Sequence, residues 1–424
     1  MDTIFALSSG SPPAAIAIVR ISGPQAGDAL AALAGRLPPS RRATLAPLRA
    51  SGGALLDRAL VLWFPGPATV TGEDLAELHL HGGRAVVAAV ERALAARPGL
   101  RRAEPGEFTR RAFANGRIDL AEAEGLADLL AAETEWQRRA ALEMAGGALS
   151  RRVEAWAGRL LALSASVEAV LDFDDEDGIA GLPAAFAEDC AALARECEAA
   201  LASPSAELLR DGFRVALAGP PNAGKSTLFN ALVESEAAIT APLAGTTRDV
   251  LTRPVALGGI PFLFVDMAGL RDEAADPVEQ LGIARARTAI GGADLVLWLG
   301  PEGEGPQGCW EIDARCDRTD RAVKRNPRRV VSALTGEGME ALRQDLIDHA
   351  AQAMPRPGQA ALSAHQREWV ALAAQALSEA ATAGDSLIVA EHLRQARGAF
   401  DRITGRAGTE DVLDALFARF CIGK

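Results

Sequence analysis

The sequence predicts a multidomain protein of α+β and α/β class, with an N-terminal α/β domain, a discontinuous all-α helical domain and an inserted α/β domain with a mostly parallel sheet. Three observations predict it. Short β-like runs alternate with helical ones over residues 1–118, alanine and leucine recur at helical spacing over 119–210 and 356–424, and strand-loop-helix alternation fills 211–355. Helical composition on both flanks indicates an insertion, since two separate helical domains would each need their own core.

Composition favours a cytoplasmic protein. The 424 residues suffice for about two or three domains, and 49% hydrophobic and 24% charged residues are ordinary for a soluble chain. The net charge of −12 gives no global signal for nucleic-acid binding, so any such contact must use a local basic surface. Five cysteines without a CxxC pattern fit a reducing cytoplasm. No signal peptide and no apolar run of ~18 residues is present, so we expect no membrane contact.

Lysine is rare in this chain. Of 44 basic residues only Lys225, Lys324 and Lys424 are lysines, which leaves 41 arginines. Lysine in a Gly-rich loop and at residue 424 indicates that a compact ammonium group is needed at these two positions. For Lys424 the alternative explanation is that lysine occurs there by chance.

The elements expected outside the inserted domain follow the hydrophobic periodicity. The helix over 183–203 would carry Cys190 and Cys197 on one face, as small apolar core residues. The acidic run over 172–178 lacks the ligand spacing of a Ca²⁺ loop and is expected to be a solvated loop. Strands are expected over 16–21, 60–64 and 75–80, and helices over 85–96, 120–144, 149–171, 183–203, 363–383, 386–403 and 409–420.

The inserted domain contains a phosphate-binding loop. Gly219–Ser226 matches Gly-x4-Gly-Lys-Ser, directly between the β-like run Phe213–Ala218 and a helical segment. In such a loop the backbone N–H groups wrap a phosphate, Lys225 reaches the β/γ oxygens, and the Ser226 hydroxyl ligates Mg²⁺. Further strands are expected over 260–266, 294–299 and 328–333, and helices behind the loop, after residue 278 and over 338–353.

Two more motifs follow in the order of a nucleotide-hydrolysing domain. Asp266 and Gly269 end an apolar strand, where the carboxylate can hold Mg²⁺ through water and the glycine N–H can sense a γ-phosphate. Gly245–Asp249 lies between this strand and the phosphate loop, and either of its threonines can ligate Mg²⁺ while the triphosphate is bound. The segment is therefore expected to act as an order–disorder switch.

The catalytic apparatus departs from that of signalling GTPases. Leu270 follows Gly269, so the glutamine that would orient the attacking water is missing. Asn222 offers a side-chain oxygen that can hold a monovalent cation beside the phosphates. Glu279 can reach the water through a second water, or is an exposed glutamate near a helix N-terminus.

The base-reading motif is reduced. Ala314–Asp317 stands where GTPases usually have Asn-Lys-x-Asp. Asp317 can accept hydrogen bonds from guanine, and Arg315 can replace the lysine stem over the base. Ala314 lacks the asparagine side-chain amide that braces the loop. Ser332–Leu334 fits the last guanine loop. We therefore expect GTP rather than ATP, with weakened discrimination.

Several blocks together resemble the tRNA-modification GTPase family MnmE (TrmE), a branch of the TrmE-Era-EngA-like P-loop GTPases, over essentially the whole chain. They are Ile18–Gly23, Glu73–Gly83, Pro105–Leu120, Leu171–Phe173, the nucleotide motifs, and Cys421–Lys424. The resemblance implies an N-terminal domain (1–118) that binds 5,10-methylenetetrahydrofolate, with 5-formyltetrahydrofolate as analogue, and dimerises. It also implies a helical domain (119–210 and 356–424) and a P-loop G domain (211–355) that hydrolyses GTP and is activated by K⁺.

The resemblance further implies partners and a reaction. A homodimer would join the FAD- and NADH-dependent MnmG in a heterotetramer or larger complex. Together they would add an aminomethyl or carboxymethylaminomethyl group at C5 of the wobble uridine of certain tRNAs.

Motif matching to the family assigns roles residue by residue. The residues that match the folate site are Arg20, Glu77, Arg117 and Lys424, with Cys421 near the one-carbon group. Those that match the metal ligands are Ser226 and Thr247 for Mg²⁺, and Asn222, Ala241, Leu243 and Thr246 for K⁺. The residues that match the catalytic positions are Glu279, Asn222 and Lys225. GTP contacts fall on Asn222, Ala223, Gly224, Lys225, Ser226, Thr227, Ala241, Pro242, Leu243, Ala244, Gly245, Thr246, Thr247, Asp266, Met267, Ala268, Gly269, Asp317, Ser332, Ala333 and Leu334.

Two functions of other classes stay open at this level. A regulatory G-protein switch in ribosome assembly would share the nucleotide motifs but not the N-terminal blocks or Cys421–Lys424. A folate-binding scaffold with a degenerate G domain is suggested by Ala314 and Leu270. The sequence also leaves open whether tRNA contacts a cluster of arginines or whether these form intramolecular pairs: Arg101, Arg102, Arg110 and Arg111.

Overall fold

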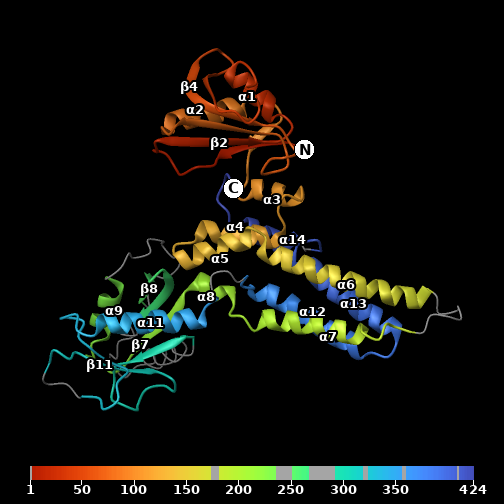
Figure 1. The fold of residues 1–424 in the computed structure, drawn as a ribbon. Helices are drawn as coiled ribbons and strands as arrows, with labels where there is room; N and C mark the ends of the chain where they lie inside the picture. Colours follow the sequence, from red (N-terminus) through yellow and green to blue (C-terminus); the bar gives the residue numbers. More distant parts are fainter. Residues whose placement is uncertain are drawn as a thin grey trace, which may run out of the picture. The chain divides into compact units, whose positions relative to one another are not determined.

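The computed structural model describes residues 2–172, 181–234, 251–266, 292–318, 323–355, 360–407 and 410–424 (Figure 1). The chain divides into two compact units. Unit 1 comprises Met1–Ala127, Leu149–Glu154 and Phe400–Lys424, and unit 2 comprises Asp128–Ala148 and Ala155–Ala399. Among the described residues no helix is both long and apolar enough to span a bilayer.

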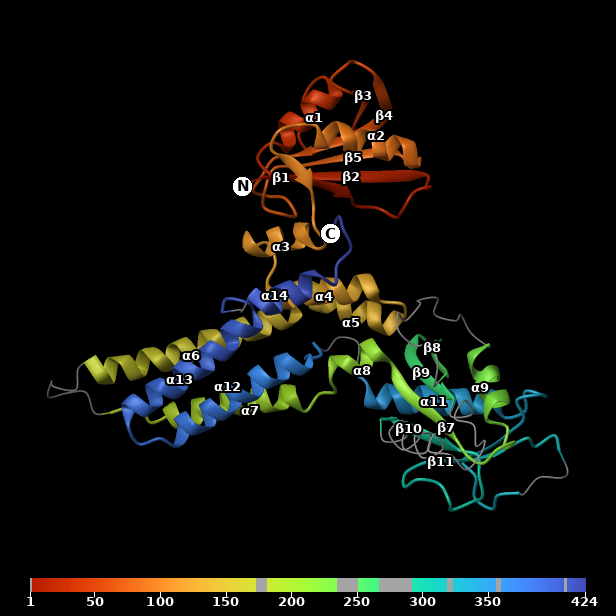
Figure 2. The same cartoon turned by 180° about the vertical axis from the view of Figure 1, so that it is seen from behind.

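Unit 1 is built on a six-stranded sheet in the order β3-β4-β5-β2-β1-β6, in which only the β1–β6 pair is parallel. Helices α1 (Ala26–Ala34) and α2 (Arg84–Ala95) cover one face, where Val19, Leu78 and Val90 belong to the buried core (Figure 2). The strands are β1 (Thr3–Leu7), β2 (Ile16–Ser22), β3 (Thr44–Arg49), β4 (Leu55–Phe64), β5 (Leu75–His81) and β6 (Leu100–Arg102).

The C-terminal segment of the chain completes unit 1. Helices α3 (Glu107–Ala114) and α14 (Glu410–Phe417) contact each other, and α14 shares a small core with the start of α4 (Leu120–Ala131) through Leu120 and Phe417. Beyond α14, Ile422 forms a β-bridge with Pro105. The last residues of the chain therefore pack against its N-terminal domain.

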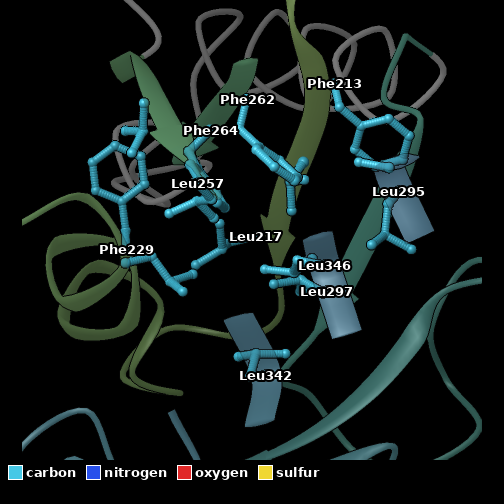
Figure 3. Close-up of a cluster of buried hydrophobic side chains, with 14 of the residues drawn as sticks. Phe213, Leu217, Phe229, Leu257, Phe262, Phe264, Leu295, Leu297, Leu342 and Leu346 are labelled. Carbon is cyan, nitrogen blue, oxygen red and sulfur yellow. The ribbon is translucent and has the colours of Figure 1, made fainter. Parts of the chain in front are cut away.

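Unit 2 contains the second sheet, in the order β12-β11-β10-β7-β9-β8, with β8 antiparallel to β9 and the other pairs parallel. Its core gathers Phe213, Leu217 and Phe262 from the strands with Phe229 and Leu346 from the helices (Figure 3). The elements are α8 (Ala206–Asp211), β7 (Phe213–Ala218), α9 (Lys225–Val233), β8 (Leu251–Leu257), β9 (Ile260–Asp266), β10 (Leu295–Trp298), β11 (Trp310–Ala314), β12 (Arg329–Val331) and α11 (Met339–Ala353).

The remaining helices are long, as their alanine- and leucine-rich sequences predict. Helices α7 and α12 lie side by side (Figures 1 and 2), and Cys190 and Cys197 of α7 are fully buried, which confirms their prediction as core residues. Burial raises the pKa of the Cys190 thiol to about 11. The helices are α5 (Glu135–Ala145), α6 (Ala148–Asp172), α7 (Phe186–Leu201), α12 (Ala364–Thr382) and α13 (Ser386–Ile403).

One helix prediction is wrong. The segment 120–144 forms two helices, α4 and α5, because Thr134 caps the second of them. The Thr134 hydroxyl accepts from Gln137 N, and the Gln137 side chain accepts from Thr134 N, so the backbone groups at the break are satisfied. Periodicity alone did not show this break.

Five strands were not predicted: β1, β3, β6, β8 and β11. β11 follows a Gly- and Pro-rich stretch, and the parallel β10–β11 connection, residues 299–309, contains no helix. Instead, Lys324 Nζ donates to Trp298 O at 2.8 Å and to Glu311 Oε2 at 2.5 Å, which ties the two strands. The expected helix after residue 278 and almost all of the acidic run 172–178 lie outside the described residues.

Candidate functional sites

The phosphate loop joins β7 to α9 with the geometry that its sequence predicts. Gly219, Asn222 and Gly224 have φ angles of 148°, 61° and 96°, and α9 begins at Lys225. A Cβ on Gly219 would lie 2.9 Å from Gly300 N, so only glycine allows this close packing of the loop against the end of β10. The chain thus presents the N-terminus of α9 to a phosphate group.

Lys225 lies inside this loop. Its side chain is anchored by Nζ, which donates to Gly219 O at 2.8 Å and to Pro220 O at 2.9 Å, and the residue is only 9% exposed. A buried ammonium beside a helix N-terminus is a strong anion-binding arrangement, since both carry positive charge. The described part of the loop therefore fits a nucleotide phosphate.

Arg315 contacts the phosphate loop rather than lying free above a base. Its Nη1 donates to Asn222 O at 2.7 Å, and a Cβ on Gly224 would lie 3.2 Å from Arg315 Cγ and Cδ. Arg315 itself has a φ of 63°. The base-reading loop is thus tied to the phosphate loop by one arginine, a contact that the sequence did not indicate.

The base-reading loops meet at Asp317. Its Oδ1 accepts from Ser332 Oγ at 2.5 Å, which lowers the pKa of the Asp317 carboxyl, and Ser332 Oγ accepts from Thr335 N at 3.2 Å. Cys316 N donates to Val331 O at 3.1 Å. Leu334 is 80% exposed beside these groups. An ionised Asp317 held in this way can accept from the two N–H groups of a guanine edge.

Asp266 ends β9 next to the phosphate-loop strand. It pairs in register with Leu217 of β7 and is only 3% exposed. The hydroxyl residues Ser226 and Thr227 lie in the first turn of α9. The predicted residues of the two segments that would close this site lie outside the described part of the chain: Ala241, Pro242, Leu243, Ala244, Gly245, Thr246, Thr247, Met267, Ala268, Gly269 and Glu279.

A second polar cluster lies in unit 1, on the sheet face opposite α1 and α2. Arg20 of β2 and Glu77 of β5 are register partners, and their side chains form two hydrogen bonds, Nη2–Oε1 at 2.8 Å and Nε–Oε1 at 3.1 Å. The Arg20 guanidinium lies 5.9 Å from the centre of the Phe108 ring. His79 Nε2 is 3.4 Å from Glu77 Oε2.

The C-terminal segment reaches the same cluster. Phe108 N donates to Lys424 O at 3.2 Å, and a Cβ on Gly423, whose φ is 96°, would lie 2.2 Å from Leu7 O. Glycine at 423 therefore lets residues 421–424 pass close to β1. Phe108, for which the sequence predicts no role, thus contacts both the Arg20 guanidinium and the backbone of Lys424.

Arg117 and Cys421 are the other two residues predicted for this site. The Arg117 side chain passes Gly72, where an added Cβ would lie 3.3 Å from Arg117 Cγ, and neighbouring Asn115 Nδ2 donates to Thr71 O at 2.7 Å. Cys421 is exposed. No contact between described residues joins Arg117 to the Arg20–Glu77 pair.

The four arginines considered for tRNA contact form intramolecular ion pairs. Arg101 pairs with Asp2 and Glu107, and Arg111 pairs with Asp2, Glu73 and Glu107. Burial alone would raise the pKa of Glu107, but hydrogen bonds from the two arginines lower it overall. Arg102 pairs with Glu91, and Arg110 with Glu410 and Asp414.

Comparison with known proteins covers the whole chain. A family model described as the MnmE helical domain matches residues 120–421, and one described as the GTP-binding protein TrmE N-terminus matches residues 3–117. The tRNA modification GTPase MnmE of Erythrobacter litoralis (strain HTCC2594) is 62% identical over 424 residues, which is 100% of both chains. That of Novosphingobium aromaticivorans is 62% identical over 435 residues, again 100% of both chains.

Among solved structures, the G domain of the T. maritima FeoB iron transporter is 25% identical and covers 32% of this chain and 98% of its own, with a TM-score of 0.25. A score this low supports no argument, so the P-loop architecture of unit 2 rests on its own strand order and loop geometry. The full-length identities and the two family models agree. The chain belongs to the MnmE family of tRNA modification GTPases.

Proposed function

We propose that this chain hydrolyses GTP to drive, together with MnmG, the addition of an aminomethyl or carboxymethylaminomethyl group at C5 of the wobble uridine of certain tRNAs. One observation carries the proposal. A phosphate loop with a buried Lys225 and a polar cluster around Arg20 and Glu77 occur in a chain that matches MnmE proteins over its full length.

GTP would be held from both ends. Lys225 and the backbone amides of Gly224–Thr227 would bind the phosphates, while Asp317, positioned by Ser332, would accept from guanine. Mg²⁺ suits hydroxyl and phosphate oxygens, so Ser226 and Thr247 would hold it. When bound, it neutralises charge that develops on the transferring phosphoryl group.

Catalysis would differ from that of glutamine-dependent GTPases. Asn222, in a left-handed conformation that asparagine tolerates, would offer its side-chain oxygen to K⁺, with Ala241, Leu243 and Thr246 as the other ligands. The cation would supply the positive charge that an arginine finger provides elsewhere. Glu279 would orient the attacking water through a second water.

The unit-1 cluster would bind 5,10-methylenetetrahydrofolate. A folate carries a polar pterin and an anionic glutamate tail, which need a carboxylate and cations. Glu77, Arg20, Arg117 and Lys424 supply these, and Arg20 donates to Glu77 Oε1 through both Nε and Nη2. Exposed Cys421 would lie near the one-carbon group. Homodimerisation, a heterotetramer or larger complex with MnmG, and a cytoplasmic location complete the proposal.

The test combines two assays. GTP hydrolysis by the purified chain is measured in K⁺ and in Na⁺, with and without MnmG, and wobble-uridine modification is measured in a strain that lacks this gene. We expect faster hydrolysis in K⁺ and loss of modification in the strain. Normal modification there would refute the proposal, and loss of modification without GTP turnover would favour a scaffold with a degenerate G domain.

The folate site has its own test. Glu77→Gln keeps the side-chain shape but removes the charge that pairs with Arg20. We expect 5-formyltetrahydrofolate to bind at least about tenfold more weakly, because the carboxylate that would accept from the pterin and that holds Arg20 in place is lost. Asp57→Asn, which alters a carboxylate of the neighbouring strand that pairs with His81, is the matched control. Unchanged binding in Glu77→Gln would place the folate elsewhere.

A further inference from the structure

Positive charge is concentrated in the N-terminal domain. Residues 1–118 contain 14 arginines and nine aspartates and glutamates, a net charge of +5, whereas the rest of the chain carries −17. Such asymmetry within an acidic protein indicates that one part meets an anionic partner. The four arginines of residues 101–111 do not account for it, because each is paired with a carboxylate.

Nine arginines of residues 1–118 form no ion pair with a described residue, and five of these nine lie along one edge of the unit-1 sheet. The other four are Arg84, Arg92, Arg97 and Arg117. β3 is the edge strand, and arginines precede it, end it and lie on its partner β4. We call this set the arginine edge: Arg36, Arg41, Arg42, Arg49 and Arg58. Figure 2 shows β3 and β4 next to α1, from whose C-terminal end Arg36 follows. All five arginines are exposed.

Little negative charge lies nearby to cancel them. Asp57 is the one carboxylate between residues 35 and 64, and it accepts from His81 N at 2.9 Å and from the His81 ring at 2.7 Å. Arg41 donates to Ala68 O and packs 5.8 Å from the Phe64 ring, and Arg49 donates to Gly53 O. Within the described parts of the chain, the side chains of the other three form no hydrogen bond or ion pair: Arg36, Arg42 and Arg58.

We propose that the arginine edge binds the phosphate backbone of the tRNA substrate, so that this chain contacts tRNA directly through its N-terminal domain. The proposal rests on the role in tRNA modification proposed above. β3 has six residues and spans about 20 Å, which is long enough to face several successive phosphates. Guanidinium groups suit this partner because their planar fork binds phosphate oxygens in pairs.

A second explanation exists for arginines on an edge strand. Charged side chains there prevent the exposed backbone of β3 from pairing with a strand of another molecule. The two explanations differ in what they predict. Loss of charge would weaken tRNA binding under the first, and would cause self-association without loss of tRNA affinity under the second.

The test uses the full-length chain with two triple variants of equal charge. Arg36→Gln/Arg42→Gln/Arg58→Gln neutralises the arginine edge at the three residues without side-chain partners. Arg84→Gln/Arg92→Gln/Arg97→Gln removes three charges from α2 and the residues after it in the same domain. The probe is an unmodified transcript of a tRNA with uridine at the wobble position. Fluorescence anisotropy measures its affinity at several KCl concentrations, and melting temperature and size-exclusion chromatography monitor folding and self-association.

We expect the edge variant to bind the transcript at least about tenfold more weakly and to lower the slope of log affinity against log salt by about 2 to 3, near one unit per lost phosphate contact. The α2 variant should change affinity less than about twofold. Equal weakening in both variants, or unchanged affinity in the edge variant, would overturn the proposal. In the deletion strain, failure of the unaltered chain to restore modification would instead refute the proposed function.

Discussion

Arg315 Nη1 donates a 2.7 Å hydrogen bond to the carbonyl oxygen of Asn222, and both residues have left-handed backbone conformations. This contact joins the loop expected to read the base to the loop expected to hold the phosphates. The arginine stem also covers Gly224, where no side chain would fit without displacing it. Affinity for the nucleotide should therefore depend on Arg315 even though its guanidinium is engaged by protein.

Arg315→Ala should weaken GTP binding about tenfold, because a hydrogen bond from a charged donor and the packing over Gly224 are both lost. Arg315→Lys should recover most of the affinity, since one N–H suffices for the Asn222 carbonyl. Arg315→Met keeps the stem without the donor and separates the two contributions. Titration with a fluorescent GTP analogue measures the affinity of each variant for the nucleotide, and Arg325→Ala serves as the control. Wild-type affinity in Arg315→Ala would show that the contact does not position the phosphate loop.

Asn222→Ala should leave nucleotide binding nearly intact and abolish stimulation of GTP hydrolysis by K⁺. The backbone complicates this variant, because alanine at a φ of 61° costs about 1–2 kcal/mol. Asn222→Gly removes the same side chain without that cost, so the two variants should agree if the side-chain oxygen is what matters. Rates of GTP hydrolysis in KCl and in NaCl test this prediction. If K⁺ still stimulates hydrolysis by Asn222→Gly, the Asn222 side chain does not hold the cation.

Glu107→Gln should lower the free energy of unfolding by about 1 kcal/mol at pH 7, allowing for solvent screening. Hydrogen bonds from Arg101 and Arg111 outweigh burial and depress the pKa of the Glu107 carboxyl below its ordinary value of 4.5. A depressed pKa means stability that is present above about pH 4.5 and lost as the pH falls through the folded-state pKa.

The difference in unfolding free energy between Glu107→Gln and the unaltered chain should therefore shrink as the pH falls below about 4.5. Urea unfolding at pH 7, 5 and 3.5 measures it, and Glu104→Gln serves as a nearby control, since the Glu107 carboxylate accepts from its backbone N–H rather than from its side chain. A difference that does not vary with pH would show that the charge of Glu107 contributes nothing.

Thiol reactivity should differ sharply among the cysteines. Cys190 is fully buried and its pKa is raised to about 11, so almost no thiolate forms near neutral pH, whereas Cys421 is exposed. A maleimide should label Cys421 within minutes at pH 7 and Cys190 only after unfolding. Peptide mapping by mass spectrometry assigns the sites. Rapid labelling of Cys190 in the folded chain would contradict the packing of α7 against α12.

The sequence predicted the nucleotide loop and most of the long helices, but not the short helices α1, α3 and α8. Gly219–Ser226 is a local motif whose glycines, lysine and flanking elements lie within about 20 residues, so the pattern alone indicates its structure. The break between α4 and α5 was missed because the Thr134 cap interrupts an otherwise continuous apolar period. Strand β3 was missed because an edge strand with Pro47 lacks the continuous apolar signal of a buried strand.

The sequence by itself therefore determined the phosphate loop and the family, since these depend on patterns between residues close along the chain. Only the tertiary structure decided which charges meet. Strand register pairs the charges of Arg20 and Glu77, and the return of the C-terminal segment brings the Lys424 backbone to Phe108. Likewise, Arg101 and Arg111 pair with carboxylates, whereas the arginines of the arginine edge form no ion pair with a described residue. Such contacts depend on chain reversals and sheet order, which act between residues distant in sequence.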